Sequence, residues 1–335
     1  MNSPGIIYDQ RLFNSDIRKD LRNCVLFILF FYVVNMIATV VVMMVAVVND
    51  PAFQSSILSI TSGNSIGFIG TDIAEIVTSI MSGPILGLMS IVGIAAGSCV
   101  FFIYRKKRFF TDVCLPAAEK MTPKIFIILV VITQGIQGVY SLIVTFIDYL
   151  LPEGMSLTES YGQAMDGLYT PVGFLYVVLI GPIFEELIFR GAVMGVLKRF
   201  GNNFAILFSA LLFGFYHALI LQIPFAFVLG LLLGYVASRW SLRAAIALHI
   251  AVNGLSVVAS VFPNEWFQIS FILFMIACAI ATAIMAIVWR DKLKTRISEG
   301  QAYYENTYKY GFSSIAFWVF AVVMTLIGLM QMSML

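Results

Sequence analysis

The sequence predicts an all-α fold, a polytopic transmembrane helix bundle with about eight to nine spans. Three observations lead to this prediction. The 335-residue chain is 60% hydrophobic and only 11% charged, whereas about 25% of the residues of a soluble protein are charged. Its apolar residues are gathered in runs of about 20, the length that crosses a bilayer as a helix. Its basic residues fall in alternate loops between these runs, as in membrane proteins of fixed orientation.

Nine apolar runs are the predicted spans, and a polar N-terminal segment, residues 1–23, precedes the first of them. The runs lie near residues 24–48, 79–104, 124–150, 171–199, 203–221, 223–238, 243–262, 266–289 and 312–334. The first run is longer than the core of a signal peptide, about 7–15 residues, so it is expected to remain as a span. The fourth is expected to break or bend at Gly181-Pro182, because proline removes a helix hydrogen bond. Residues 24–335 are therefore expected to form one membrane domain.

Lysine and arginine assign a side of the membrane to each loop. Of the twenty Lys and Arg residues, all but Arg190 lie before the first run, or within or at the edges of the loops after the second, fourth, sixth and eighth runs. The other loops, chiefly 49–78 and 151–170, carry acidic residues and are expected to be solvated and external. This pattern places residues 1–23 in the cytoplasm and the C-terminus outside. The basic run 105–108 could contact anionic lipid, but the same rule explains it. No nucleic-acid partner is expected.

Charged residues inside the fourth run need an explanation, because an ionised side chain at bilayer depth costs about 2.5–3.5 kcal/mol. Glu185, Glu186 and Arg190 lie in a stretch that is otherwise almost entirely apolar. Glu186 and Arg190 are four residues apart and share a helix face, so we expect them to form an ion pair. Glu185 is five residues from Arg190 and points elsewhere, which leaves its carboxylate free for function.

Both histidines of the chain also lie in predicted spans. His217 follows Phe213 by four residues and His249 precedes Asn253 by four, so each pair shares a face of its helix. At 1.5 Å per residue, Glu185 and His217 lie about 20 Å from the basic ends of their helices, and His249 about 9–15 Å. These groups can meet within the membrane if the fourth helix continues to its basic end.

A carboxylate, two imidazoles and a carboxamide suit amide hydrolysis. The carboxylate supplies a base for water, and the other groups can hold a developing oxyanion or protonate a leaving amine. A lone intramembrane histidine is more often a hydrogen-bonding residue between helices, but that role does not explain why all these groups fall in three neighbouring spans. A proton or ion pathway through the same residues remains open at this point.

At these residues the sequence resembles the CPBP family of intramembrane proteases, which includes the CAAX prenyl endopeptidases and the bacterial Abi-type proteins linked to bacteriocin processing and self-immunity. The family pattern is E-E-x-x-x-R, then F-x-x-x-H, then H-x-x-x-N. The chain keeps this order with Glu185, Glu186 and Arg190, then Phe213 and His217, then His249 and Asn253. The resemblance covers about 180–260, and the protease-like core is expected at about 171–289.

The resemblance implies an enzyme, a glutamate-dependent intramembrane endopeptidase. Glu185 would activate the attacking water and His217 would position it. His249 and Asn253 would hold the oxyanion, which completes the expected catalytic group. Supporting roles fall to Glu186, Arg190 and Phe213.

The family is often labelled as metalloprotease, and Glu185 with two histidines could in principle bind zinc. We expect no required metal, because these residues come from three helices and form no helical H-E-x-x-H motif. The four cysteines are scattered and offer neither a disulfide framework nor a metal-ligand spacing; they are Cys24, Cys99, Cys114 and Cys278.

The expected substrate is a membrane-associated peptide or protein that is prenylated, leader-bearing or bacteriocin-like. One alternative is a non-enzymatic membrane immunity or scaffold protein, which would keep its function without Glu185. Another is a proton-coupled transporter, for which broken helices in both halves of an inverted repeat would be expected. The architecture suggests a multi-pass protein of a bacterial cell membrane, with the lipid bilayer as its surroundings. The sequence specifies no oligomeric state.

Overall fold

The structure, a computed structural model, describes residues 10–61, 75–80, 83–105, 119–152, 156–166, 168–262, 264–300 and 306–333. In these ranges all regular structure is helical and no strand occurs. The long helices are α1 (Gln10–Asn49), α4 (Pro84–Arg105), α6 (Pro123–Leu150), α11 (Asn202–Tyr216), α12 (Gln222–Arg239), α13 (Leu242–Val261), α14 (Glu265–Val288) and α17 (Ile315–Ser333). With the composite helix of residues 171–200, they match the nine predicted runs one for one. The predicted fold class is therefore confirmed.

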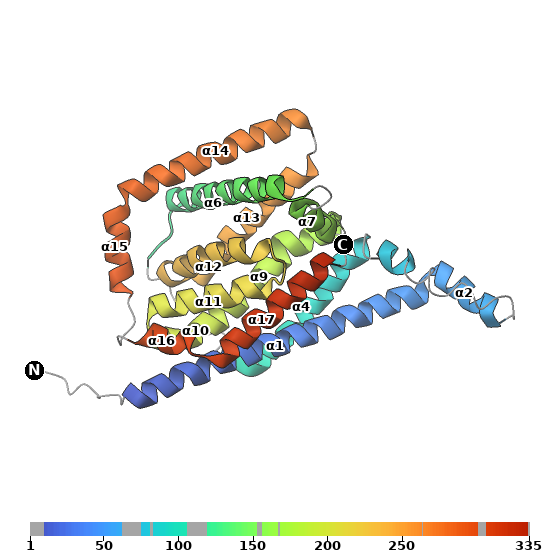
Figure 1. Cartoon of the computed structure of the whole chain (residues 1–335), viewed down its shortest axis with the longest axis horizontal. Helices are drawn as coiled ribbons and strands as arrows, with labels where there is room; N and C mark the ends of the chain where they lie inside the picture. Colours follow the sequence, from blue (N-terminus) through green and yellow to red (C-terminus); the bar gives the residue numbers. More distant parts are fainter. Residues whose placement is uncertain are drawn as a thin grey trace, which may run out of the picture.

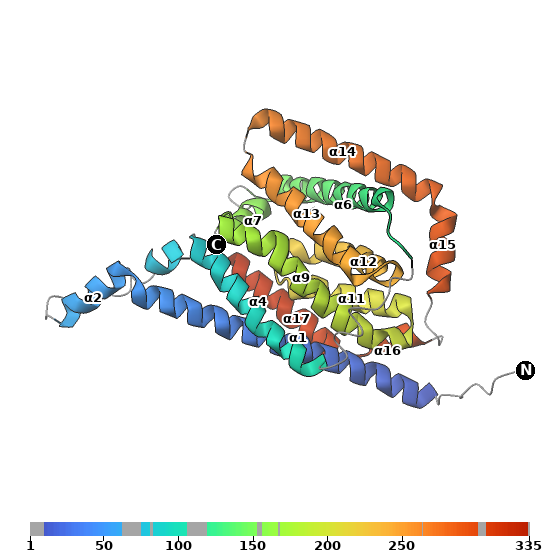
Figure 2. The ribbon, with the colours of Figure 1, turned by 180° about the vertical axis from the view of Figure 1, so that it is seen from behind.

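The helices are long and apolar enough for a membrane protein. Six of them can cross a bilayer by length and composition, including the composite helix 171–200, and 84–100, 202–216 and 315–331 are shorter apolar helices. They are arranged in layers (Figure 1). Helices α1 and α4 pack along each other on one side, α6 and α14 on the opposite side, and the composite helix, α11, α12 and α13 lie between them (Figure 2). Helix α17 packs against α1 and α11.

Capping side chains fix where several helices begin. At the start of α6, Thr122 accepts a hydrogen bond from the amide of Ile125 at 3.3 Å, and Pro123 follows it in the first turn. At the start of α13, Ser241 accepts one from the amide of Ala244 at 3.1 Å. The first amides of a helix have no partner within it, so such caps stabilise a helix by about 1 kcal/mol.

The fourth predicted span is a continuous helix whose hydrogen bonding changes along its length. It comprises α8 (Pro171–Phe174), the π-helix η1 (Leu175–Ile180), α9 (Gly181–Glu186), the π-helix η2 (Leu187–Val193), α10 (Met194–Leu197) and the 3-10 turn η3 (Lys198–Phe200). Gly181 has helical dihedral angles, φ −52° and ψ −60°. Of the two outcomes expected at Gly181-Pro182, a break or a bend, the break is therefore wrong. The wide turn η1 accommodates the proline, because the Gly181 amide bonds to the carbonyl of Tyr176, five residues back. The helix therefore runs to its basic end.

Helix α11 is shorter than the predicted run 203–221. It ends at Tyr216, His217 follows it, and α12 begins at Gln222. We expected His217 within a span and Gln222 in a loop, so these boundaries are wrong. Apolar residues continue through 217–221, but the backbone turns at Ala218, which has φ 53°. Hydropathy does not detect such a turn, because the segment is apolar on both sides of it.

Several segments expected as loops or polar tails are helical. They are α2 (Pro51–Thr61), α7 (Leu157–Asp166), α15 (Arg290–Glu299), α16 (Thr307–Phe312) and the start of α1. Within 10–23, Phe13, Ile17 and Leu21 are buried against the core. Their spacing of four residues forms one apolar face, which explains why a polar segment extends the first helix. Residues 62–74 and 106–118, with part of the basic run 105–108 and Cys114, lie outside the described residues.

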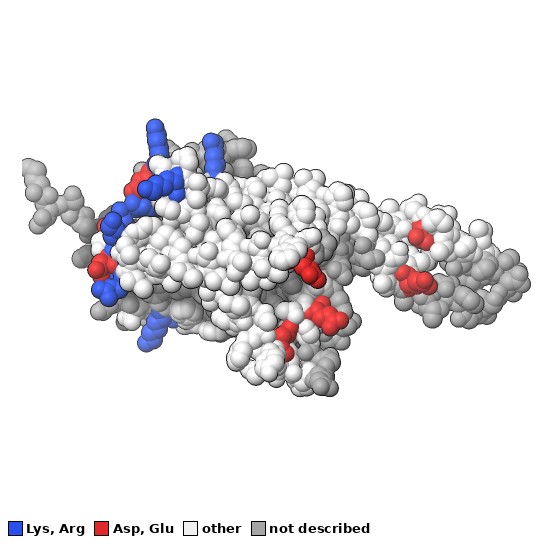
Figure 3. Space-filling model, turned by 90° about the horizontal axis from the view of Figure 1, so that it is seen from above, with Lys and Arg blue, Asp and Glu red and all other residues white. Residues whose placement is uncertain are grey.

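The described charged residues are distributed unequally between the two ends of the bundle. Lys and Arg side chains gather at the end that carries α15 and the start of α1, and acidic side chains lie at both ends (Figure 3). At the basic end, Arg199 pairs with Asp20 at 2.7 Å and Arg239 with Glu119 at 2.5 Å. This arrangement agrees with the alternation of charged loops along the chain. Arg190 lies inside the bundle, 4% exposed.

Candidate active site

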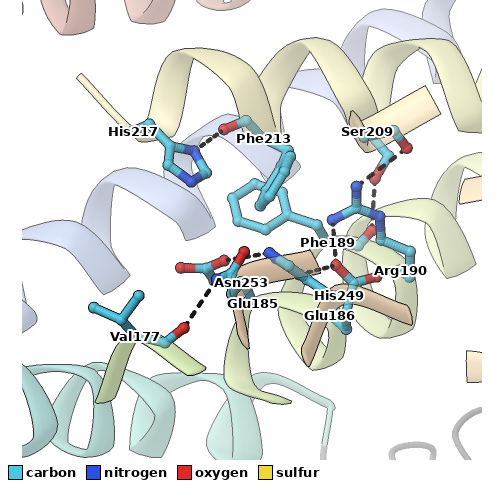
Figure 4. A network of polar contacts seen from close by, with 11 residues as sticks. Val177, Glu185, Glu186, Phe189, Arg190, Ser209, Phe213, His217, His249 and Asn253 are labelled. Atoms are coloured by element: carbon cyan, nitrogen blue, oxygen red, sulfur yellow. Dashed lines mark hydrogen bonds and ion pairs between the residues drawn. The ribbon is translucent and has the colours of Figure 1, made fainter. Parts of the chain in front are cut away.

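Glu186 and Arg190 form the buried ion pair that their spacing predicted. Nη1 of Arg190 lies 2.9 Å from Oε1 of Glu186, and both side chains are inaccessible to solvent. Nη2 of Arg190 donates to the carbonyl of Gly230 on α12 at 3.1 Å, and the guanidinium lies 4.3 Å from the ring centre of Phe213 on α11. The pair therefore joins three helices (Figure 4). Within the described chain, Oε2 of Glu186 and Nε of Arg190 are buried without a hydrogen-bond partner.

His249 lies between the two adjacent carboxylates. Its Nδ1 is 3.0 Å from Oε1 of Glu186, and its Nε2 is 3.8 Å from Oε2 of Glu185. A carboxylate only accepts hydrogen bonds, so Nδ1 of His249 carries a hydrogen and donates it. The longer distance exceeds a hydrogen bond. Glu186 thus orients the imidazole, and the opposite ring nitrogen faces Glu185.

Glu185 differs from its neighbour in its surroundings. Its side chain is 13% exposed, whereas that of Glu186 is inaccessible. Glu186 is held by Arg190 and His249, but Glu185 forms no hydrogen bond within the described chain. Helix geometry explains the difference, because residues one apart point about 100° from each other. The sequence prediction that Glu185 projects away from the ion pair agrees with this arrangement.

His217 is oriented by the end of its own helix. Its Nδ1 lies 2.9 Å from the carbonyl oxygen of Phe213. That carbonyl lacks its usual α-helical partner, because the amide of His217 bonds instead to Gly214, three residues back. A carbonyl only accepts, so Nδ1 carries the hydrogen and Nε2 of a neutral ring has a free lone pair. Figure 4 shows the imidazole and the Glu185 carboxylate facing the same space.

Phe213 separates the two histidines. Its ring centre lies 4.7 Å from that of His217 and 5.8 Å from that of His249, both edge to face. Phe213 itself is fully buried. Its ring therefore holds both imidazoles and the Arg190 guanidinium at fixed separations, which accounts for an aromatic residue four positions before His217.

Asn253 donates a hydrogen bond to the backbone carbonyl of Val177, which has no partner within its own helix because of Pro182. Its Nδ2 donates to the carbonyl of Val177 at 2.9 Å. In an α-helix this carbonyl would accept from Gly181, but the Gly181 amide bonds to Tyr176. In π-helical bonding the donor would be Pro182, which has no N–H. The Asn253 amide fills this gap, which orients its Nδ2 toward Val177 and leaves one N–H of that nitrogen for another acceptor.

The structure adds residues that we did not single out for the site. Gly230 accepts from Arg190, and a Cβ there would lie 3.1 Å from Nη2 of Arg190 and 3.1 Å from the Phe213 ring. The absence of a side chain at Gly230 therefore leaves room for the guanidinium. Ser209 donates to the carbonyl of Phe189 at 2.7 Å and so secures η2. In the sequence, Ser209 could have been noticed as a polar residue within an apolar run.

The side chains that could bind a metal here are those of Glu185, His217 and His249. Among the described residues, no three His, Cys, Asp or Glu side chains converge as the ligands of an ion. Zinc sites in enzymes use three protein ligands with open lone pairs. His217 and His249 each donate Nδ1–H to a protein acceptor and keep Nε2 as the other ring atom, as metal-binding histidines also do. In the described structure, however, these atoms and the Glu185 carboxylate do not converge on one position.

The fold and site together define an integral, multi-pass membrane protein with an ionisable cluster buried among apolar helices. Residues 167–255 match the family model for type II CAAX prenyl endopeptidase Rce1-like proteins. This segment contains every residue of the three motifs and confirms the resemblance seen in the sequence. This part of the chain is therefore similar to the type II CAAX prenyl endopeptidases, and the match supports a relationship to the CPBP family of membrane proteases. No curated protein and no solved structure matches it.

Proposed function

We propose that the chain is an intramembrane endopeptidase that uses a water molecule activated by Glu185. Its substrate is a membrane-associated peptide or protein, prenylated, leader-bearing or bacteriocin-like. The observation that supports this most is the division between two adjacent carboxylates. Glu186 is fixed by Arg190 and His249, and Glu185 keeps an accessible carboxylate beside two imidazoles. A base for water needs such a carboxylate, free of competing donors.

The charges of the site support the assignment. In the proposed state both ring nitrogens of His249 carry a hydrogen, so that the charges of His249 and the Arg190 guanidinium balance those of the two carboxylates. Neutrality matters here, because an uncompensated charge in the interior is strongly destabilising. In this state Glu185 is ionised and can accept a proton, and Nε2 of His249 carries a hydrogen that can stabilise negative charge.

Hydrolysis then proceeds with a balanced transfer of protons. The water oxygen attacks the carbonyl carbon of the scissile bond while Glu185 takes a proton from the water. Nε2–H of His249 and the remaining N–H of Asn253 stabilise the oxyanion. Nε2 of His217 accepts a hydrogen bond from the water and holds it in line. The carbon–nitrogen bond breaks, and Glu185 returns the proton to the leaving amine.

The test is cleavage of a panel of prenylated, leader-bearing and bacteriocin-like peptides in vesicles that hold the purified full chain. The variants are Glu185→Gln and the matched control Glu265→Gln, which alters an exposed residue at the start of α14. Each is assayed with and without a chelator. We expect the Glu185 variant to lose about 10²–10⁴-fold in rate, and the control and the chelator to have no effect.

Other outcomes would contradict parts of the proposal. Full cleavage by Glu185→Gln would remove this residue from the chemistry. Cleavage abolished by the chelator would make the polar groups metal ligands. If the wild-type chain binds peptides of the panel but cleaves none of them, the non-enzymatic immunity or scaffold role would be favoured.

A further inference from the structure

The loop that carries His217 contains an unusual backbone conformation. Ala218 has φ 53°, and it is the only non-glycine residue with positive φ in the described part of the chain. Alanine in this left-handed region costs about 1–2 kcal/mol, and helices that end this way usually have glycine at that position. Ala218 is 2% exposed. A strained residue next to a proposed catalytic group is held in place by its surroundings and is a reason to look for function.

The last helix holds one side of this loop. A Cβ at Gly328 of α17 would overlap the carbonyl oxygen of Ala218, and would lie 3.1 Å from its carbonyl carbon and 3.3 Å from Cδ1 of Ile220. Only glycine allows the two backbones to approach this closely. The backbone of α17 therefore lies directly against the residue that follows His217.

Helix α6 holds the opposite end of the loop. The hydroxyl of Tyr140 donates to the carbonyl of Leu221, and its ring packs on Phe225 at 5.7 Å between ring centres. The next residue, Gln222, donates through its side chain to the hydroxyl of Tyr161 on α7 at 3.0 Å. The loop between α11 and α12 is thus fixed at both ends by helices that lie outside the matched segment 167–255.

We propose that Gly328 and Tyr140 are positioning residues, which clamp the loop 217–221 and thereby set the direction of the His217 imidazole. His217 is the last residue before the strained turn, and its Nδ1 bonds to Phe213 one turn back. A displacement of Ala218 rotates the end of α11 and disturbs this bond. The inference rests on the proposed role of His217 in catalysis, and it gives α17 and α6 a function in the active site.

The chain offers a direct probe of this clamp, because it has only two histidines. In full-length protein labelled with ¹⁵N-histidine, His217 and His249 give separate imidazole signals, and His217→Ala identifies which is which. We expect Gly328→Ala to shift the His217 signals and leave those of His249 in place. Peptide cleavage by this variant should fall about ten- to a hundredfold in kcat with little change in KM.

Two further variants complete the test. Gly162→Ala on α7 is the matched control, since nothing lies within 4 Å of its added Cβ. It should change neither signal nor rate. Tyr140→Phe removes only the hydroxyl that holds Leu221 and should shift the same His217 signals even if Gly328→Ala does not fold.

Each result has a defined meaning. Unchanged His217 signals in the folded variants, or equal shifts at both histidines, would overturn the clamp. Shifted His217 signals with normal cleavage would retain the clamp and contradict the catalytic role of His217. Shifted His217 signals with reduced kcat would support both.

Discussion

Oε1 of Glu186 lies 3.0 Å from Nδ1 of His249, a residue 63 positions further along the chain. The same oxygen bonds to Arg190 at 2.9 Å. One carboxylate oxygen therefore fixes both a local ion pair and a contact between α9 and α13. Because Glu186 is occupied in this way, the adjacent Glu185 remains available, and His249 presents its other nitrogen toward it. The testable consequences concern the charges, the packing and the backbone around this centre.

Removal of one member of the buried ion pair should be more damaging than removal of both. Arg190→Met leaves Glu186 without its cation and should lower the free energy of unfolding by about 3–5 kcal/mol. The double variant Arg190→Met, Glu186→Gln leaves no unpaired charge and should lose less. Chemical unfolding in detergent micelles measures both. If the double variant is less stable than the single one, the pair does not act as a unit.

Enlargement of Gly230 should disturb the site through packing. A Cβ would lie 3.1 Å from Nη2 of Arg190 and 3.2 Å from the backbone of Ala210. Gly230→Val should therefore cost about 1–3 kcal/mol in unfolding free energy and reduce cleavage, as thermal denaturation and the peptide assay would show. Gly254→Ala is the control, because its nearest neighbour, Val178, is at an ordinary 3.6 Å. Equal effects of the two substitutions would contradict a special role for Gly230.

The bond between Asn253 and Val177 can be separated from any role of Asn253 in catalysis. Asn253→Leu leaves the Val177 carbonyl buried without a donor, at a cost of about 1–3 kcal/mol. Pro182→Ala supplies the missing amide, so the double variant should regain stability. Cleavage should not recover with it, because the carboxamide is still absent. If stability and cleavage both recover, Asn253 has a structural role alone. If neither recovers, Pro182 is not the reason that the Val177 carbonyl lacks a helical partner.

The distribution of charge predicts which end of the bundle faces the cytoplasm. In a background without native cysteines, Ser298→Cys lies in α15 at the basic end and Thr158→Cys lies in α7. Both positions are exposed. A membrane-impermeant thiol reagent should label position 158 in intact cells and position 298 only after the membrane is opened. Labelling of position 298 in intact cells would reverse the orientation.

Much of this protein follows from the sequence alone, because the relevant signals are local. Runs of apolar residues predicted every long helix, and a separation of four residues predicted the pair of Glu186 and Arg190. The three motifs predicted the family. These features depend on helix periodicity and on the free energy of placing side chains in a bilayer, which a linear sequence expresses directly.

The tertiary structure alone decided what the motif residues contact. The partner of His249 depends on how α13 packs against α9, and the partner of Asn253 depends on a carbonyl freed by a π turn and a proline. The left-handed Ala218 and its contact with Gly328 join segments more than a hundred residues apart. Such contacts have no signature in periodicity or hydropathy, because they arise from the shapes of backbones that meet only when the chain has folded. The sequence determines which helices form and which polar groups they carry, and packing determines the direction in which each group points.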